Sequence, residues 1–259
     1  MAKNGTAIIG QGSLPDNGTA STGTLQWHSA ALSELGYVRS VNEDALLDAR
    51  EQSLWVVADG MGGHSFGDEA SQTIVDQLIS FQRSDNMAES ITDIEKRLTQ
   101  ANTICRDKSQ GQVMGSTVVA LFVHEPYCFF IWAGDSRIYR LRDSRLEQMT
   151  EDHSYVQELV TLGEIRREDM EKHPSSNIIT RAIGVHDELQ LENQHTLIES
   201  GDRFLICSDG LFKDLEHDEI AKGLSHTTVE ESVQSLVDLS LERGGRDNTT
   251  AIVVQAEFR

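Results

Sequence analysis

Residues 116–149, with the sequence STVVALFVHEPYCFFIWAGDSRIYRLRDSRLEQM, decide the fold class. This stretch divides into runs of strand length, which are 116–123, 127–133, 137–141 and 145–149. Only a few residues, including Glu125-Pro126, separate each run from the next. Connections this short join antiparallel neighbours, because a parallel crossover needs about a dozen residues or more. The pattern therefore argues against a doubly wound parallel sheet.

Upstream of this block, the pattern predicts a strand that begins near Leu25 and a fully buried strand at Leu54–Ala58. Two amphipathic helices follow, because apolar residues recur there at helical spacing. Their apolar stripes are Ala70, Ile74, Val75, Leu78 and Ile79 for the first, and Met87, Ile91, Ile94, Leu98, Ala101 and Cys105 for the second. We interpret both stripes as packing faces.

Downstream, the polar stretch 150–187 predicts an inserted helical or irregular flap. Further strands are expected at 188–197, 203–208 and 249–256, and helices at about 216–224 and 229–242. Strands and helix pairs thus come in blocks without regular alternation, which is typical of a layered α+β architecture.

The chain has 259 residues, of which 38% are hydrophobic and 25% charged, as in ordinary globular proteins. Residues 1–24 are rich in Gly, Ser, Thr and Asn and show no helix or strand period. Such a segment cannot bury enough apolar surface to offset its loss of conformational entropy. We therefore expect a flexible segment at 1–24 and a single domain at 25–259.

The net charge of −20 argues against nucleic acid and membrane surfaces as partners, since both are anionic. The longest apolar run, Tyr127–Ala133, is far shorter than the roughly 20 residues that span a bilayer. No signal peptide is evident. The odd number of widely spaced cysteines, Cys105, Cys128 and Cys207, fits buried thiols in a reducing compartment. We expect a cytoplasmic protein.

Four aspartates lie at the ends of apolar runs, and each has a small neighbour. They are Asp59 beside Gly60, Asp135 beside Gly134, Asp209 beside Gly210, and Asp247 beside Asn248. In antiparallel sheets, the end of one strand lies beside the start of the next, so these side chains can converge on one edge. Clustered carboxylates need protons or cations to neutralise them, and oxygen ligands favour Mg²⁺ or Mn²⁺.

A second group of candidate residues is the hexapeptide Arg39-Ser40-Val41-Asn42-Glu43-Asp44. A guanidinium can bind phosphate bidentately, and nearby carboxylates can hold a metal ion or orient its water. An arginine beside a glutamate can equally be a surface ion pair, so this stretch alone decides nothing.

Together these residues resemble the PPM family, the type-2C metal-dependent protein Ser/Thr phosphatases, in their bacterial form. The matching motifs occur in family order between about Leu25 and Val254. They are R-x-x-N-E-D at 39–44, V-A-D-G-M-G-G-H at 57–64, G-S-T at 115–117, G-D-S-R at 134–137, T-x-D-H-S at 150–154, N-I-I-T-R-A-I-G at 177–184, S-D-G-L at 208–211 and R-D-N-T-T at 246–250.

The resemblance implies a four-layer α-ββ-α sandwich of two antiparallel sheets flanked by helix pairs. It also implies a centre of two Mn²⁺ or Mg²⁺ ions, with Arg39 binding the substrate phosphate. The implied metal ligands are Asp59, the Gly60 carbonyl, Asp209 and Asp247, with Glu43 and Asp44 at the second ion and Asp135 at a weaker third site. Asn248 is expected to support the ligands.

Two positions depart from the family pattern. Met61 stands where eukaryotic members have a histidine, the general acid, which leaves His64 as the nearest candidate for that role or for a plain loop residue. Lys213 stands where members with a third metal have an aspartate, and Asp214 follows it. A third metal site is therefore doubtful. His153, His173 and Cys207 are expected to be structural.

The sequence therefore predicts an enzyme that hydrolyses phosphoserine or phosphothreonine with a metal-activated water and opposes a bacterial Ser/Thr kinase. Phosphorylated proteins and a cognate kinase are the expected partners. Two alternatives remain open: a catalytically weak regulator that binds phosphoproteins, and a hydrolase of small phosphate esters.

Overall fold

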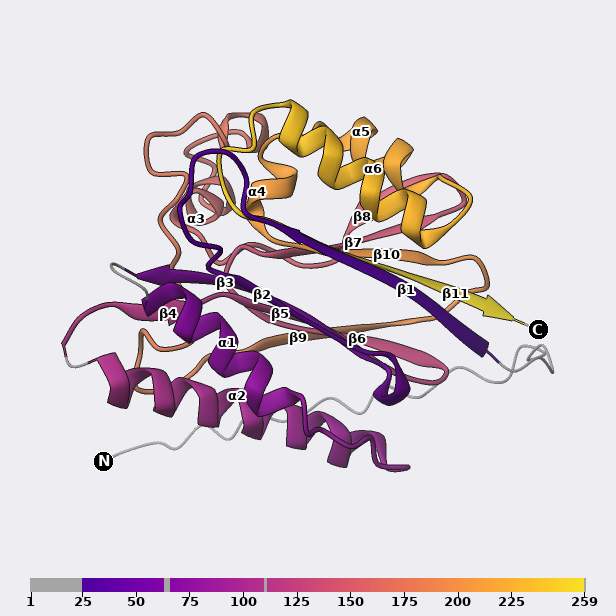
Figure 1. The fold of residues 1–259 in the computed structure, drawn as a ribbon, viewed down its shortest axis with the longest axis horizontal. Coiled ribbons are helices and arrows are strands. Elements are labelled where there is room, and N and C mark those ends of the chain that lie inside the picture. Colours follow the sequence, from indigo (N-terminus) through magenta and orange to yellow (C-terminus); the bar gives the residue numbers. More distant parts are fainter. Residues whose placement is uncertain (1–24, 63–65, 110, 259) are drawn as a thin grey trace, which may run out of the picture.

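Two antiparallel sheets pack face to face, with helices on both outer faces (Figure 1). The computed structural model describes residues 25–62, 66–109 and 111–258. The predicted segment 1–24 and His64 lie outside these residues. The four layers are the α-ββ-α sandwich that the resemblance implied, and the α+β prediction is confirmed.

The first sheet has the strand order β1-β11-β10-β7-β8. Its members are β1 (Leu25–Glu34), β11 (Thr249–Phe258), β10 (Arg203–Cys207), β7 (Arg137–Arg142) and β8 (Arg145–Gln148). Strands β1 and β11 pair along their whole length, from Leu25 opposite Phe258 to Glu34 opposite Thr249. The two ends of the described chain therefore lie side by side in one sheet.

The second sheet has the strand order β2-β3-β5-β6-β9, with β4 paired to the far end of β3. Its members are β2 (Asp44–Ala49), β3 (Leu54–Gly62), β4 (Met114–Ser116), β5 (Val118–His124), β6 (Tyr127–Ala133) and β9 (Glu192–Leu197). Side chains alternate across it, as the pleat requires. Val56 and Ala58 of β3 pack toward the helices, whereas Trp55 and Val57 fill the space between the sheets.

The helices form the outer layers. The second sheet is covered by α1 (Phe66–Leu78) and α2 (Met87–Ser109), and the first by α4 (Asp209–Phe212), α5 (His217–Leu224) and α6 (Val229–Glu242). Helix α6 begins with a capping box between Thr228 and Glu231. The flap contains α3 (Tyr155–Thr161) and a 3₁₀ turn at Arg167–Asp169, and another 3₁₀ turn, Arg50–Gln52, precedes β3.

Several predicted boundaries were wrong. Strand β3 continues past Ala58, so Asp59 lies within the strand rather than after it. The run at 116–123 is two strands with Thr117 between them, and the strand expected at 188–197 begins only at Glu192. Ile79 was assigned to an apolar stripe, but it lies beyond the end of α1 and is 66% exposed.

Two elements were not predicted at all. Strand β2 reads Asp-Ala-Leu-Leu-Asp-Ala, in which apolar and polar residues do not alternate as in a clear strand signal. Helix α4 is a single turn that follows Ser208. Both elements carry candidate site residues.

Among the described helices, none combines the length and the apolar character that a bilayer crossing requires. The three cysteines are free and buried, as predicted. Burial raises the pKa of the Cys207 thiol far above its usual range, which agrees with a structural role.

Candidate metal and phosphate site

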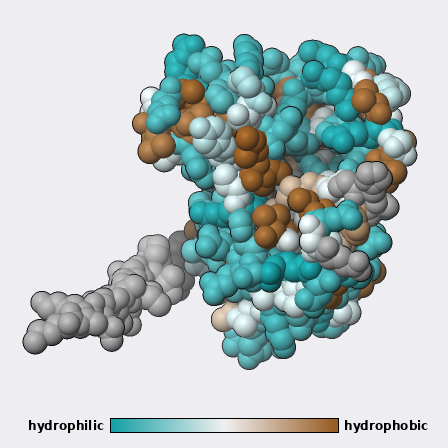
Figure 2. Space-filling view, turned by 90° about the vertical axis from the view of Figure 1, so that its left-hand side faces the viewer, coloured by the Kyte–Doolittle hydropathy of each residue, from teal (hydrophilic) through white to brown (hydrophobic). Residues whose placement is uncertain are grey.

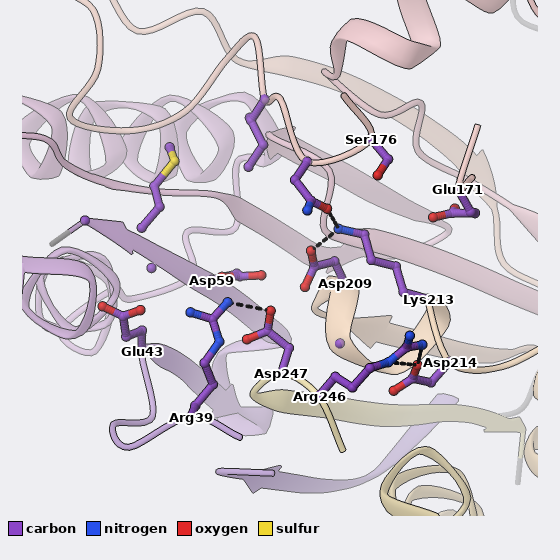
Figure 3. Close-up of a pocket in the computed structure, with 16 residues that line it drawn as sticks. Arg39, Glu43, Asp59, Glu171, Ser176, Asp209, Lys213, Asp214, Arg246 and Asp247 are labelled. Carbon is purple, nitrogen blue, oxygen red and sulfur yellow. Dashed lines mark hydrogen bonds and ion pairs between the residues drawn. The ribbon is translucent and has the colours of Figure 1, made fainter. Parts of the chain in front are cut away.

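The predicted carboxylates converge at the edge of the molecule where β3 ends and the flap begins. A cavity of about 490 Å³ opens there, and Asp59, Asp209, Asp247, Glu43 and Arg39 all line it (Figure 3). Figure 2 views the molecule from this side and shows apolar side chains gathered in the middle of a largely hydrophilic face. Asp59 comes from the second sheet, whereas Asp209 and Asp247 lie next to strands of the first sheet, so the cavity combines residues from both sheets.

Each sheet supplies its carboxylates through a different element. Asp44 of β2 lies opposite Asp59 of β3 in the strand register. Asp209 is the first residue of α4 and is separated from β10 only by Ser208, and Asp247 stands two residues before β11. Strand ends that lie far apart in the sequence thus meet at one sheet edge, as the sequence predicted.

Gly60 allows the backbone to pack closely beside Asp59. A Cβ atom at this position would lie 2.1 Å from the Gly67 carbonyl oxygen and 2.6 Å from the Glu43 carbonyl oxygen. The Gly60 amide donates a hydrogen bond of 3.0 Å to that same Glu43 oxygen. Any side chain here would therefore separate the loop that carries Glu43 from strand β3.

Asn248 fixes the loop between β1 and β2. Its Oδ1 accepts a hydrogen bond from the Glu43 amide at 2.8 Å, and its Nδ2 donates to the carbonyls of Leu35 at 2.9 Å and Val41 at 3.1 Å. This side chain is buried and joins the start of β11 to the loop that carries Arg39. Asn248 therefore ties the start of β11 to the backbone beside Glu43.

Two hydroxyl residues hold the backbone of Asp59. Thr117 Oγ1 accepts from the Asp59 amide at 3.1 Å and contacts Ser136 Oγ at 2.7 Å, while Ser116 Oγ donates to the Asp59 carbonyl at 3.0 Å. The G-S-T motif at 115–117 was recognised in the sequence without a role. A similar hydroxyl, Ser208 Oγ, donates to Asp44 Oδ2 at 2.7 Å.

Burial disfavours the charged form of the carboxylates and so raises their pKa values. Burial raises the pKa of Asp44 to about 7, although hydrogen bonds partly oppose the shift. Burial, together with the charges of Asp44 and Asp209, raises the pKa of Asp59 well above its usual range. Burial and the charge of Asp209 likewise raise the pKa of Asp135 to about 7. A nearby cation would reverse these shifts.

Basic side chains already pair with the carboxylates of the β10 and β11 side. Arg39 Nη2 lies 2.7 Å from Asp247 Oδ2, and Lys213 Nζ lies 2.5 Å from Asp209 Oδ2. Within the described residues, no group of three or more His, Cys, Asp or Glu side chains is arranged to hold a metal ion as it stands. Asp209 and Asp247 are each paired with a basic side chain instead.

The chemistry of the residues nevertheless fits a hard divalent cation. The acidic groups at the cavity offer only oxygen atoms, the ligands that Mg²⁺ and Mn²⁺ prefer. Asp135 is only 4% exposed, and its Oδ1 has no hydrogen-bond partner among the described residues. Buried carboxylate oxygens of this kind need a proton or a cation. The donor set therefore fits the predicted metal centre.

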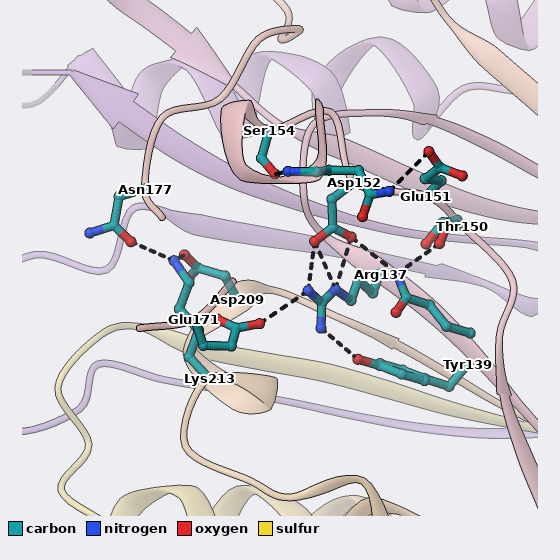
Figure 4. Close-up of polar contacts among 12 residues, drawn as sticks. Arg137, Tyr139, Thr150, Glu151, Asp152, Ser154, Glu171, Asn177, Asp209 and Lys213 are labelled. Atoms are coloured by element: carbon teal, nitrogen blue, oxygen red, sulfur yellow. Dashed lines mark hydrogen bonds and ion pairs between the residues drawn. The ribbon is translucent and has the colours of Figure 1, made fainter. Parts of the chain in front are cut away.

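The two departures from the family pattern lie at this cavity. Met61 lines it, so a thioether occupies the position of the expected histidine. Lys213 also lines it and bonds both Asp209 and, at 2.8 Å, Asn177 Oδ1 of the flap (Figure 4). Asp214 is held by Arg246 instead. Lys213 therefore stands inside the site, beside Asp209 and in the field of Asp135.

The two flap histidines make structural hydrogen bonds. His153 Nδ1 accepts from the Gly134 amide at 3.1 Å, and its ring stacks on Trp132. His173 Nδ1 accepts from the Ser175 amide at 3.1 Å. Nearby, Arg137 forms a bidentate ion pair with buried Asp152 (Figure 4). These contacts agree with the structural roles predicted from the sequence.

Comparison with known proteins decides the family. The sequence profile described as "Protein phosphatase 2C" matches residues 37–245, which is most of the chain. This chain belongs to the protein phosphatase 2C family. Most residues that line the carboxylate cavity lie within the matched region, whereas Arg246 and Asp247 follow its end.

Curated members of the family include named serine/threonine phosphatases. The chain is 34% identical over 236 residues to PstP of Mycobacterium tuberculosis, which covers 89% of this chain and 45% of that protein. It is also 34% identical over 246 residues to the serine/threonine phosphatase stp of Listeria monocytogenes, covering 89% of this chain and 96% of that protein. The chain therefore spans less than half the length of PstP but nearly all of the Listeria protein.

Solved structures of family members share the fold. PppA, described as a key regulatory component of T6SS in Pseudomonas aeruginosa, has a TM-score of 0.84 and 44% identity, with 89% of this chain and 98% of that chain covered. The catalytic domain of PstP in complex with two manganese ions has a TM-score of 0.80 and 31% identity, with 90% of this chain and all of that chain covered.

Proposed function

We propose that this chain is a metal-dependent protein serine/threonine phosphatase. The observation that carries the proposal is the convergence of Asp59, Asp209 and Asp247 on one cavity with Arg39 at its edge. Its named relatives are serine/threonine phosphatases, and the PstP structure contains two manganese ions. This support extends to two Mn²⁺ ions, and we propose Mg²⁺ as an alternative.

The residues divide into metal ligands and phosphate ligands. We propose that Asp59, the Gly60 carbonyl, Asp209 and Asp247 hold the two ions, with Glu43 and Asp44 beside the second. When bound, the ions supply Lewis-acid polarisation of the phosphoryl group and lower the pKa of a bound water. Asn248, Ser116 and Thr117 fix the backbone that positions these ligands.

Arg39 is proposed to bind the substrate phosphate. Its guanidinium is about half exposed at the cavity, so it can reach a ligand there while it remains beside Asp247. A planar guanidinium binds two phosphoryl oxygens at once and so orients the phosphorus atom for in-line attack. The proton donor to the leaving oxygen stays a prediction at His64, since Met61 has no transferable proton.

A third metal ion is not part of the proposal. The Lys213 ammonium already lies 2.5 Å from Asp209, and a cation next to another cation is repelled. Asp135 is therefore proposed as a weak ligand at most. Asp214 bonds Arg246 and is not proposed as its companion.

The biological setting is proposed from the relatives and the cysteines. Likeness to PppA, a regulatory component, supports a regulatory role. We propose that phosphorylated proteins are the substrates and that the enzyme opposes a Ser/Thr kinase. Three free, buried cysteines support a reducing compartment such as the cytoplasm.

Metal removal and restoration tests the proposal. Protein treated with a chelator should be inactive on a phosphothreonine peptide, and Mn²⁺ or Mg²⁺ should restore turnover. Activity that persists without metal, or that returns with Zn²⁺ but not with Mn²⁺, would contradict the carboxylate site.

The same assay separates the alternatives. Faster turnover of a nucleotide than of the phosphopeptide would favour a hydrolase of small phosphate esters. Phosphopeptide binding without turnover in Mn²⁺ would favour a regulator that has lost catalysis.

A further inference from the structure

A second cavity, which we call the flap pocket, lies behind the segment that borders the carboxylate cavity. It has a volume of about 350 Å³, and its lining includes Glu151, Gln157, Glu158, Thr180, Arg181 and Glu192. The two cavities flank one stretch of chain: Ser176, Asn177 and Ile179 line the first, whereas Thr180 and Arg181 line the second. A polypeptide bound at the first cavity therefore has the second within reach of neighbouring residues.

Gln157 gives the flap pocket an unused hydrogen-bond acceptor. The residue is only 8% exposed, and its Nε2 donates to Glu151 Oε1 at 3.1 Å. Its Oε1 has no partner among the described residues, although it is buried. A buried amide oxygen without a partner is costly, so this wall of the pocket lacks a donor.

The charges of the flap pocket are also unbalanced. Glu151, Glu158 and Glu192 bring three carboxylates, whereas Arg181 is the single basic side chain among its lining residues. Arg181 is already engaged, because its Nη1 lies 3.3 Å from Glu192 Oε2. Glu151 and Glu158 are exposed at the pocket and have no basic partner among the described residues.

Neighbouring groups do not correct this imbalance. His153 lies at the pocket with its Nε2 2.9 Å from Glu192 Oε2, and burial lowers its pKa, which favours the neutral ring. Asp152 also lines the pocket, but its carboxylate forms an ion pair with Arg137. The pocket therefore has an excess of negative charge and an excess of hydrogen-bond acceptors.

The surroundings suit a long side chain with a charged end. Leu162 is 72% exposed and lines the pocket, so it offers an apolar surface to an aliphatic stem. A smaller cavity of about 240 Å³ continues past Glu158 and Arg181 and adds another carboxylate, Glu188.

We propose that the flap pocket binds an arginine or lysine side chain of the phosphorylated polypeptide whose phosphate lies in the carboxylate cavity. An arginine matches best, because its guanidinium can donate to Gln157 Oε1 and to Glu158 or Glu151 at the same time. The proposal rests on the proposed function for the identity of the polypeptide. It makes the flap pocket a determinant of substrate choice.

Binding without chemistry tests the pocket by itself. Calorimetry should use unphosphorylated peptides that carry one arginine, its uncharged analogue citrulline, or norleucine at the same position. The arginine peptide should bind about tenfold more tightly than the other two, and Glu158→Gln should remove most of that difference. Gln157→Met keeps the volume but removes the acceptor, so it should weaken the arginine peptide selectively.

A control variant separates the pocket from general charge effects. Glu168→Gln changes the charge of the same flap by the same amount but lies outside the pocket. It should retain the preference for arginine. Equal binding of all three peptides to the wild type, or a preference that survives both Glu158→Gln and Gln157→Met, would overturn the proposal.

Hydrolysis connects the pocket with the carboxylate cavity. Phosphothreonine peptides should carry the arginine at each position within about five residues of the phosphothreonine, which covers about 17 Å of extended chain on either side. One or two positions should raise kcat/KM about tenfold over citrulline, and Glu158→Gln should lower this ratio toward one.

The outcomes of the two assays can be told apart. Arginine-selective binding without any phosphatase activity would refute the proposed function and leave the pocket intact. Turnover in Mn²⁺ with no arginine preference at any position would refute the pocket and leave the proposed function intact. Spermidine that binds as tightly as the arginine peptide would identify a small polyamine as the ligand and so overturn the assignment to a substrate side chain.

Discussion

The two walls of the carboxylate cavity carry the same kind of side chain in opposite electrostatic surroundings. On the β2–β3 wall, burial and neighbouring carboxylates raise the pKa of Asp44 to about 7 and that of Asp59 well above its usual range. On the β10–β11 wall, Asp209 and Asp247 each bond a basic side chain. The carboxylates of the β2–β3 wall therefore need a proton or a bound cation, whereas those of the β10–β11 wall are already paired with Arg39 and Lys213.

This difference teaches that cation binding at the cavity is a competition. An incoming ion stabilises the charged form of Asp59, which lines the cavity, and of its strand partner Asp44, but it must share Asp209 with Lys213 and Asp247 with Arg39. The basic residues thus act as internal counter-ions whose removal should change metal affinity as well as chemistry.

The largest effect is expected for Asp59→Asn, which tests the wall that lacks counter-ions. Turnover of a phosphopeptide should fall by at least about a hundredfold, since the loss of even an outer partner of a metal ligand costs about 10–100-fold. In chelator, the Tm of the same variant should rise by about 2–4 °C, because one repelling carboxylate is gone. Asp107→Asn, on the outer helix α2, should change neither quantity. A fully active Asp59→Asn enzyme would refute the metal site.

Arg39→Ala is expected to have the next largest effect. Loss of bidentate phosphate binding should lower kcat/KM by roughly ten- to a few hundred-fold, since charged hydrogen bonds contribute about 1.5–3 kcal/mol. If Arg39 served only as a counter-ion to Asp247, kcat/KM at saturating Mn²⁺ would stay constant and Mn²⁺ would bind more tightly. Calorimetry with Mn²⁺ beside phosphopeptide kinetics distinguishes these results.

Lys213 variants sharpen the comparison at the opposite wall. Lys213→Met removes the ammonium beside Asp209 and should tighten Mn²⁺ binding by about tenfold, a shift of about 1.4 kcal/mol. Lys213→Asp should additionally introduce binding of a further Mn²⁺ at millimolar metal and make turnover more dependent on Mn²⁺. Unchanged affinity in both variants, measured by calorimetry, would mean that Lys213 does not compete for Asp209.

The smallest effect is expected for Asp214→Asn. This carboxylate lines the cavity, but it bonds the exposed guanidinium of Arg246 rather than another candidate metal ligand. Turnover and Mn²⁺ affinity should both stay within about twofold of the wild type, because no proposed metal ligand is lost and the amide oxygen can still accept from Arg246. A large loss of Mn²⁺ affinity would identify Asp214 as a metal ligand and so contradict the assignment of the walls.

The sequence predicted the layers of the fold because the apolar patterns are strong where burial is complete. The runs at 127–133 and 229–242 match β6 and α6, whose apolar residues fill the core between the layers. Strand β2 was not predicted from the sequence, because it is only partly buried and its polar residues obscure the strand period. The single turn of α4 is too short to show a helical period.

The candidate site was predictable as a set of residues but not as a network. Asp59, Asp209 and Asp247 could be found because each stands at the end of a strong apolar run. The ion pair of Lys213 with Asp209 and the clamp of Asn248 on Glu43 depend on side-chain direction, which no periodicity encodes. The role of Ser116 and Thr117 behind Asp59 depends likewise on the pairing of β3 with β4.

The pairing of β1 with β11 has a consequence for the order of assembly. Glu34 lies opposite Thr249, so β1 can form its hydrogen bonds with β11 only after β11 has been synthesised. Contacts between such distant residues form slowly, because a long loop must be closed before they give any stabilisation. During synthesis from the N-terminus, the β2–β3 wall is complete long before Asp247 leaves the ribosome. We therefore expect the carboxylate cavity to be completed only when β11 docks and brings Asp247 to it.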